Sequence, residues 1–289
     1  MDIVPQLIVN SLIAGSIYSL VALGFNLIYG TTRFFNLAHG VMAAAGGYSV
    51  FFTTRSLGWN IYLSAVVSIL LIGLIGYLLD KIIYRPLRRK KSSSMVMLVA
   101  SLGVFSAFQA ILAMLFSNQF QSLKDSVVEK TYDIAGSILT QTQLIIILVG
   151  IISTFALKIF LDQTRFGKAV KAVSDDEEVS KIVGLNTDRI IASTFFIGSS
   201  IAALAGILVG LDTGIEPTIG MGLLLKGVVA AIVGGIGNIY GSILGGLLLG
   251  FAENFGIWKI SSDWKEAITF GLLVAFLIFR PQGIMNKKK

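Results

Sequence analysis

The chain has 289 residues, of which 55% are hydrophobic and only 13% are charged. Soluble globular domains carry about a quarter charged residues, so this composition nearly excludes a soluble enzyme. The formal net charge is +7, but the basic residues gather in short clusters beside apolar segments. Such clusters are typical of the cytoplasmic anchors of membrane proteins, and we expect no nucleic-acid partner. The absence of cysteine excludes disulfides and thiolate metal sites.

Nine apolar segments follow one another along the chain, most of them near the ~20 residues that a membrane-spanning helix needs. They cover about residues 5–30, 37–54, 60–79, 95–116, 142–161, 190–211, 219–234, 239–256 and 264–279. The sequence therefore predicts an all-α, polytopic transmembrane protein with a single domain over 1–289. It has nine spans and an outside N-terminus if every segment crosses, or eight and an inside N-terminus if 31–54 is re-entrant. We favour nine.

The distribution of basic residues predicts the orientation. Five of them lie within 85–91, and three lysines occupy 287–289. Short basic segments stay on the cytoplasmic side, so both places are expected to be cytoplasmic. Two crossings separate 85–91 from the loop 162–189, which is then cytoplasmic as well, and the polar stretch 117–141 lies outside. The first segment lacks a basic leader and is expected to be an uncleaved span.

Small residues gather in two of the predicted helices. Residues 43–47 read Ala-Ala-Ala-Gly-Gly, and the segment 219–256 is predicted to be a tight helical hairpin broken at 234–238. Gly237, Gly241 and Gly245 are spaced four apart. Small residues at that interval let two helix backbones approach closely in lipid. We therefore expect broken, small-residue-rich central helices that pack on several sides or line a narrow path.

Few ionisable side chains lie within the predicted spans. Lys226 and Glu253 are two of them, and such residues are functional hypotheses by default. Because both lie toward the outer ends of their segments, snorkelling to the interface is the simpler interpretation. His39, the only histidine, is expected near a membrane interface in helix packing, with a gating role as the alternative. No side chain is singled out as binding a transported solute.

The loop 162–189 carries the signals of a short capped helix. Ser174 and Glu177 have the spacing of a capping box, and Asp175 lies in the first turn, where the helix dipole favours negative charge. Gly184 supplies a left-handed stop. These residues predict a helix over about 175–183, preceded by another short helix that begins near Phe166.

The predicted loop helix has an apolar face formed by Val179, Ile182 and Val183. A helix that lies on the bilayer carries basic residues on its polar face, whereas this one begins with acidic residues. Docking to a cytoplasmic protein is the interpretation we favour, and a pair of interfacial helices is the alternative.

The chain lacks the motifs of a catalytic site. It contains no G-x-x-x-x-G-K-[ST] phosphate loop, no G-x-G-x-x-G after a strand, and neither H-E-x-x-H nor G-x-S-x-G. A membrane protein with these properties and a docking helix is expected to be a translocation subunit that is energised by another protein, not an enzyme.

Five motifs, in order along the whole chain, suggest a family. They are Phe-Asn-Leu-Ala-His-Gly at 35–40 with Gly-Gly-Tyr at 46–48, Tyr-Arg-Pro-Leu-Arg at 84–88, Gly-Leu-Asn-Thr-Asp-Arg at 184–189 with Leu-Ala-Gly at 204–206, the glycine block 234–246, and Arg-Pro-Gln-Gly at 280–283. Together they resemble the permease subunits of bacterial ABC importers for branched-chain amino acids, a group related to ribose-type sugar permeases. The second motif and the modest length resemble the shorter of two paralogous permeases. Asn-Leu at 36–37 and Lys-Ala-Val-Lys at 168–171 are minor departures from the family pattern.

The resemblance implies a multi-pass subunit of the bacterial inner (plasma) membrane that translocates leucine, isoleucine and valine. It implies four further components: a second permease subunit, two ABC ATPase subunits and an extracytoplasmic substrate-binding protein. ATP would be bound by the ATPase subunits, so no cofactor is expected in this chain. Urea, amides or another small solute are alternative cargoes of the same machinery. A stand-alone secondary transporter is a more distant alternative, because such a protein needs coupling groups near mid-membrane.

Two sets of candidate residues follow. Those expected to couple the cytoplasmic loop to an ATPase are Arg165, Gly167, Ser174, Asp175, Glu177, Val179, Ile182, Gly184 and Asn186. Those expected in the translocation path or in close helix packing are Asn36, His39, Gly40, Gly237, Gly241 and Gly245. No catalytic residue and no metal site is expected.

Overall fold

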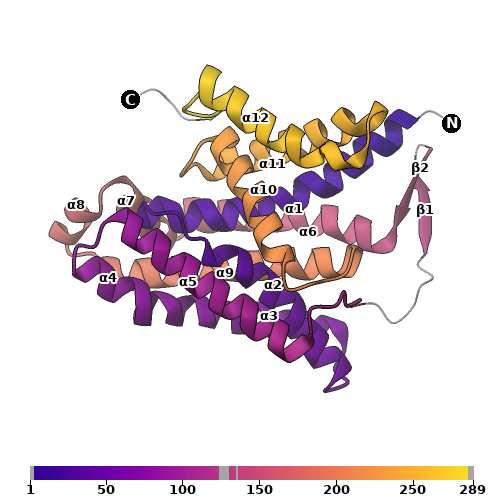
Figure 1. Cartoon of the computed structure of the whole chain (residues 1–289). Coiled ribbons are helices and arrows are strands. Elements are labelled where there is room, and N and C mark those ends of the chain that lie inside the picture. The colour runs from indigo at the N-terminus through magenta and orange to yellow at the C-terminus, as the bar shows by residue number, and fades with distance from the viewer. Residues whose placement is uncertain (1–2, 124–129, 135, 286–289) are drawn as a thin grey trace.

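The computed structural model describes residues 3–123, 130–134 and 136–285 and is built almost entirely of helices (Figure 1). The predicted apolar segments are occupied by α1 (Ile3–Thr32), α2 (Ala38–Arg55), α3 (Ile61–Leu79), α5 (Ser94–Phe116), α6 (Gln141–Gln163), α9 (Thr187–Asp212), α10 (Ile219–Gly234), α11 (Ile239–Gly256) and α12 (Lys265–Phe279). These bounds lie within a few residues of the predicted ones. The all-α, polytopic class is therefore confirmed.

Shorter elements connect the long helices. The π-helical turn η1 (Asp80–Tyr84) and α4 (Arg85–Arg89) extend α3, α7 (Arg165–Asp175) and α8 (Glu177–Ile182) form the loop after α6, and the turns η2 (Ile257–Lys259) and η3 (Ser262–Trp264) precede α12. A small antiparallel hairpin, β1 (Thr131–Ile134) and β2 (Ser137–Thr140), pairs Thr131 with Thr140. This hairpin was not predicted from the sequence.

Helix length and apolarity together give fewer membrane-crossing helices than the sequence predicts. Among the described residues, five helices meet both criteria: α1, α3 with its extension to Arg89, α5, α6 and α9. The pair α10 and α11, bent by 115° at its break, qualifies together as a sixth. The predicted eight or nine spans are thus not confirmed. One reason is that α2, with 18 residues, is rich in alanine and glycine and is buried in protein rather than exposed to lipid.

The connecting elements define two ends of the molecule (Figure 1). The helices α4, α7 and α8 lie together at one end, and the N-terminus and the β1–β2 hairpin lie at the opposite end. We call these the α8 end and the β-hairpin end. The last described residues lie toward the α8 end, where Ile284 and Met285 donate backbone hydrogen bonds to the carbonyls of Val233 and Gly234. Helix α12 and the long exposed faces of α3, α5 and α6 form the periphery.

The centre of the molecule is packed through small residues, as the sequence predicts for 43–47. A Cβ atom on Gly206 of α9 would lie 1.8 Å from the carbonyl oxygen of Ala43 in α2. A Cβ atom on Gly46 would lie 2.6 Å from the Cα atom of Ala203. Only glycine allows backbones to approach this closely, so α2 and α9 are held in direct backbone contact.

The arrangement contains an internal repeat of opposite orientation. In this repeat, α1, α2 and α3 correspond to α9, α10 and α11. The contact of α1 with α11 therefore corresponds to that of α9 with α3, and the contact of α2 with α9 corresponds to that of α10 with α1. Both α2 and α10 follow a short non-helical segment, 33–37 and 213–218, and they meet where a Cβ atom on Gly40 would lie 2.4 Å from the carbonyl oxygen of Gly220. Inverted repeats with discontinuous helices are a transporter architecture.

Candidate functional site

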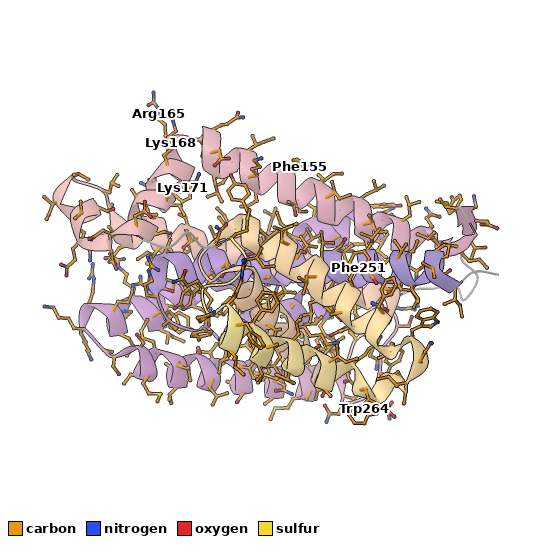
Figure 2. All side chains as sticks on the ribbon, turned by 90° about the horizontal axis from the view of Figure 1, so that it is seen from above. Phe155, Arg165, Lys168, Lys171, Phe251 and Trp264 are labelled. Carbon is orange, nitrogen blue, oxygen red and sulfur yellow. The ribbon has the colours of Figure 1, made fainter. Side chains whose placement is uncertain are left out.

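The loop 162–189 folds into two helices at the α8 end. The face of α7 that packs on the protein consists of Gly167, Val170 and Val173. A Cβ atom on Gly167 would lie 2.4 Å from the Cα atom of Leu161, so glycine permits the sharp turn from α6 into α7. The basic side chains of α7 lie on its outer side, where Figure 2 labels Arg165, Lys168 and Lys171.

The predicted capping box at Ser174 and Glu177 is wrong. Helix α7 continues through Ser174 to Asp175, and the chain becomes extended at Asp176, with φ −152° and ψ 112°. The Asp176 carboxylate caps α8 by accepting from the backbone nitrogens of Glu178 and Val179 at 2.8 and 2.9 Å. The apolar face of α7 explains the shift, because it extends to Val173 and carries the helix past the predicted cap.

Other members of the loop set also have defined places. Glu177 forms an ion pair with Lys181 at 2.7 Å, and the Ser174 carbonyl accepts a hydrogen bond from the Arg33 guanidinium. Gly184 has φ +88°, which confirms the predicted left-handed stop. The Asn186 side chain caps α9 by accepting from the backbone nitrogen of Arg189 at 3.1 Å.

The apolar face of α8 is left uncovered by the rest of the described chain. Val179, Ile182 and Val183 are 54%, 83% and 69% exposed. The neighbouring Ser180 is buried and fixes the helix on the protein. The structure therefore presents a small apolar surface on a capped helix, which we call the α8 face.

The start of α9 is joined to α4 by ion pairs. The Asp188 carboxylate accepts from Arg85 Nε at 2.8 Å and from Arg89 Nη2 at 3.0 Å. Arg88 donates to Asp80, whose side chain is fully buried. Arg85 and Arg89 thus connect α4 to the start of α9, about 100 residues away in sequence, and Arg88 connects α4 to η1.

The same cluster reaches the beginning of α2. The Tyr84 hydroxyl donates to Asn36 Oδ1 at 3.1 Å, and that oxygen also accepts from the backbone nitrogen of Ala38 at 3.1 Å. The buried Tyr84 ring lies between Phe34 and Phe195, with ring centroids 5.2 Å away on both sides. The motifs at 35–40, 84–88 and 184–189 therefore form one continuous set of contacts, which we call the motif chain.

His39 lies deeper than predicted. It is fully buried, and its Nε2 atom is 3.2 Å from the carbonyl oxygen of Val21, in the middle of α1. The non-helical segment 33–37 explains this, because it brings the chain back along α1 before α2 begins. The prediction of a helix-packing histidine is supported by its contact with Gly24, and its full burial excludes a place on the surface of the protein.

The glycine stripe of the α10–α11 hairpin is only partly as predicted. Cβ atoms on Gly241 and Gly245 would lie 2.3 and 2.0 Å from the carbonyl oxygens of Gly234 and Ala230, so both glycines pack the two helices together. Gly237 is not part of this contact. It lies in the turn with φ +80° and open space around its Cβ position, because α11 begins only after the cap residue Asn238.

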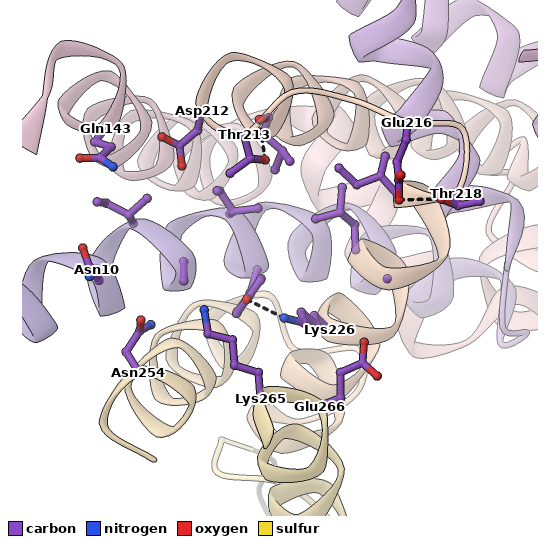
Figure 3. Close-up of a pocket in the computed structure, with 18 residues that line it drawn as sticks. Asn10, Gln143, Asp212, Thr213, Glu216, Thr218, Lys226, Asn254, Lys265 and Glu266 are labelled. Carbon is purple, nitrogen blue, oxygen red and sulfur yellow. Dashed lines mark hydrogen bonds between the residues drawn. The ribbon is translucent and has the colours of Figure 1, made fainter. Parts of the chain in front are cut away.

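A cavity of about 570 Å³ lies between α1, the segment before α10, α10 itself and the elements around α12 (Figure 3). Its polar lining includes Asn10, Gln143, Asp212, Glu216, Lys226, Asn254, Lys265 and Glu266. Its apolar lining comes mainly from α1 and α10. Because Gln143 lies in the first turn of α6, which directly follows β2, the cavity belongs to the β-hairpin end.

A buried polar cluster forms one wall of this cavity. Glu253 is 0% exposed, and its carboxylate accepts from the Tyr18 hydroxyl at 2.7 Å and from the Thr269 hydroxyl. Lys226 lies 3.2 Å from the same carboxylate and 3.1 Å from the Tyr18 oxygen. The expected snorkelling of Glu253 is wrong, because Lys226 compensates its charge inside the protein.

A second cavity, of about 890 Å³, lies at the α8 end between α1, α7 and the α10–α11 turn. Asn26 is at its inner limit, donating to Ser242 Oγ at 2.7 Å and accepting from the backbone nitrogen of Gly237 at 3.0 Å. Tyr18 and Asn26 both belong to α1, so about 12 Å of helix separates the two cavities. That stretch of α1 is fully buried.

Residues 7–277 match the family described as the permease component of the branched-chain amino acid transport system. The chain belongs to this family. It is 33% identical to the high-affinity branched-chain amino acid transport system permease protein BraD of Pseudomonas aeruginosa and 32% identical to LivH of Escherichia coli K12; each match covers 98% of this chain and 95% of the relative. The fructose import permease protein FrcC of Rhizobium meliloti is 30% identical over 43% of this chain and 36% of its own length.

Family membership confirms the resemblance inferred from the motifs, including the distant relation to sugar permeases. The chain is a multi-pass membrane permease. Sequence reasoning nevertheless missed two features of the site: the contacts that join the three motifs, and the pairing of Lys226 with Glu253. The one signal for the second feature was the presence of two opposite charges within apolar segments, which does not by itself reveal that they meet.

Proposed function

We propose that the chain is the membrane-spanning permease subunit of an ATP-driven ABC importer for leucine, isoleucine and valine. The relatives BraD and LivH, which match over almost the whole chain, are named for high-affinity branched-chain amino acid transport. The exposed α8 face is the observation that carries the proposal of ATP-driven transport. Because the sequence has no P-loop of its own, ATP would be bound by a separate subunit that docks on this face. The whole chain acts as one permease domain.

We place the α8 end in the cytoplasm. The arginines of α4 and the basic side chains of α7 gather there, as the positive-inside rule requires; Lys287–Lys289 lie outside the described residues. The N-terminus lies at the opposite end from the last described residues (Figure 1), which supports an odd number of crossings. In the nine-span arrangement, α2 and α10 each cross together with the non-helical segment before them.

The α8 face is the docking surface for an ATPase subunit. Arg165, Asp175 and Glu177 would surround it with charges, while Gly167 and Gly184 hold the two short helices at fixed angles. Two ATPase subunits bind the ATP, so this chain needs no cofactor and catalyses no reaction. A movement imposed on α8 would pass through the motif chain to the start of α2, where His39 contacts α1 and Gly40 packs on α10.

The proposal includes the remaining components of an ABC importer. A second permease subunit completes the translocation path, and an extracytoplasmic binding protein delivers the solute at the β-hairpin end. The alternative cargoes, urea, amides or another small solute, would use the same docking surface. One observation favours a gradient-driven transporter as the second candidate function: Glu253 is a buried carboxylate, and such groups within membrane helices form proton relays in pumps and transporters. Its pairing with Lys226 leaves it charge-compensated, so we rank this candidate lower.

Purification of the tagged chain from its native membrane, followed by uptake of radiolabelled leucine, tests the proposal. We expect two ATPase subunits and a second permease to co-purify, and leucine uptake to require ATP. The same partners without uptake of any branched-chain amino acid would move the substrate to another small solute. Purification of the chain alone, with uptake driven by an ion gradient, would replace the proposal with the secondary transporter.

A further inference from the structure

The cavity at the β-hairpin end has a cation in its wall that is held in place by groups behind it. The Lys226 ammonium has three N–H donors. One is directed to Glu253 and one to the Tyr18 oxygen, at 3.2 and 3.1 Å, and the ammonium also lies 5.2 Å from the centroid of the Tyr18 ring. The side chain is 21% exposed, and Lys226 lines the cavity (Figure 3). It can therefore offer a donor to an anionic group in the cavity.

The buried carboxylate behind Lys226 is already satisfied. Glu253 accepts from Tyr18 and Thr269 as well as from Lys226, and its side chain is 1% exposed. It cannot itself reach a molecule in the cavity. Its role is to hold the ammonium in one position, which lowers the entropy lost when that ammonium binds a carboxylate.

Two carboxylates on other elements also line the cavity. Glu216 lies in the segment before α10 and Glu266 at the start of α12, and both side chains are exposed and line the cavity. Figure 3 shows these carboxylates on different elements around Lys226. The Glu216 carboxylate is oriented by the Thr218 hydroxyl at 2.7 Å. An ammonium group in the cavity would therefore find acceptors on elements other than α10, which carries Lys226.

The rest of the lining suits an aliphatic side chain. It includes Ile13, Ala14 and Ile17 from α1 and Leu223 from α10. A volume of about 570 Å³ lies within the range of small-molecule sites, roughly 300–1,000 Å³. A fixed cation, separate carboxylates and an aliphatic wall are the complement of a zwitterion with a branched hydrocarbon side chain.

We infer that this cavity is a binding site for the free amino acid inside the permease, with the substrate carboxylate on Lys226, its ammonium toward Glu216 or Glu266, and its side chain on Ile13, Ile17 and Leu223. The inference rests on the proposed function, since it takes a branched-chain amino acid as the transported solute. It goes further by assigning this chain a binding site of its own, distinct from that of the binding protein. Glu253 is a positioning residue.

The first test fills the cavity without disturbing the fold. Gly222 lies on α10 at the cavity wall, and a Cβ atom there would meet nothing within 4 Å. The Gly222→Leu variant should assemble normally and take up leucine at least tenfold more slowly at saturating binding protein. Gly103 on α5 is the matched control, because its Cβ position is equally open and it does not line the cavity. Gly103→Leu should retain wild-type uptake.

The second test isolates the cation. Replacing Lys226 alone would leave Glu253 buried and unpaired, so the comparison uses the single variant Glu253→Gln and the double variant Lys226→Met with Glu253→Gln. The single variant keeps the ammonium but holds it less firmly, so uptake should fall in part, whereas the double variant, which lacks the ammonium, should lose at least tenfold more. Assembly of each variant is checked by co-purification and size-exclusion chromatography.

Normal uptake by the assembled Gly222→Leu variant, or equal uptake by the two Glu253 variants, would overturn the binding site. An equal loss in Gly222→Leu and Gly103→Leu would do the same, because the effect would then not depend on the cavity. Failure of the proposed function is recognised separately, in the unmodified complex: it would show no ATP-dependent uptake of leucine, isoleucine or valine.

Discussion

Ile182 offers a direct test of the α8 face, because it is 83% exposed and contributes little to the fold of the chain itself. Burial of an exposed isoleucine side chain is worth about 1.5–3 kcal/mol, and nearly all of that remains available to a docking partner. Ile182→Ala should therefore weaken ATPase binding by about 1–2 kcal/mol, or roughly 5–30-fold. Ile182→Asp should weaken it further, because a carboxylate would be buried without a partner.

The assay measures the amount of ATPase that co-purifies with the tagged permease and the ATP hydrolysis coupled to leucine uptake. Thermal unfolding of the isolated permease should change little in either variant, since exposed substitutions usually cost within about 0.5 kcal/mol. Ile260→Asp is the matched control: Ile260 is 50% exposed but lies between η2 and η3, away from α8. Retention of ATPase binding and coupled uptake by Ile182→Asp would refute docking on the α8 face.

Two further predictions concern the packing that positions these surfaces. Gly245→Ala should destabilise the permease by about 1–3 kcal/mol, because its Cβ atom would lie 2.0 Å from the carbonyl oxygen of Ala230. Gly271→Ala is the control: the space at its Cβ position is open, so this substitution should be neutral or slightly stabilising. Equal melting temperatures of the two variants in detergent would contradict the close packing of α10 on α11. Asp80→Asn should cost about 3–5 kcal/mol, because it removes the nearer charge partner of the mostly buried Arg88, which is otherwise 4.0 Å from Asp188. Unfolding at the wild-type temperature would show that this ion pair does not stabilise the fold.

The sequence predicts the local features of this protein well. Every predicted apolar segment is a helix in the described chain, because a long apolar run in a membrane protein must satisfy its backbone hydrogen bonds internally. The break between α10 and α11 and the stop at Gly184 are also as predicted, since both depend on glycine within a few residues. The membrane class and the family therefore follow from local patterns along the chain.

Local signals were less reliable where two neighbouring residues competed for the same role. Ser174 has the spacing of a cap, but the helix before it continues and Asp176 caps α8 instead. Gly237 belongs by spacing to the glycine stripe, yet it lies in the turn. In both cases the packing of the adjacent helix decided which residue ends or begins an element, and single-residue propensities differ by too little to decide it.

Long-range contacts were decided by the tertiary structure alone. The motif chain, the meeting of Gly40 with Gly220 and the compensation of Glu253 by Lys226 all join residues from different helices. A charged residue within an apolar segment shows only that its side chain is costly to bury. It does not show which residue, far away in the sequence, pairs with that charge and offsets the cost. The sequence by itself determined that helices form and, to within a few residues, where the long ones begin and end, because these depend mainly on neighbouring residues. Which helices meet, and hence where the cavity lies, was decided by close packing between backbones far apart in the sequence.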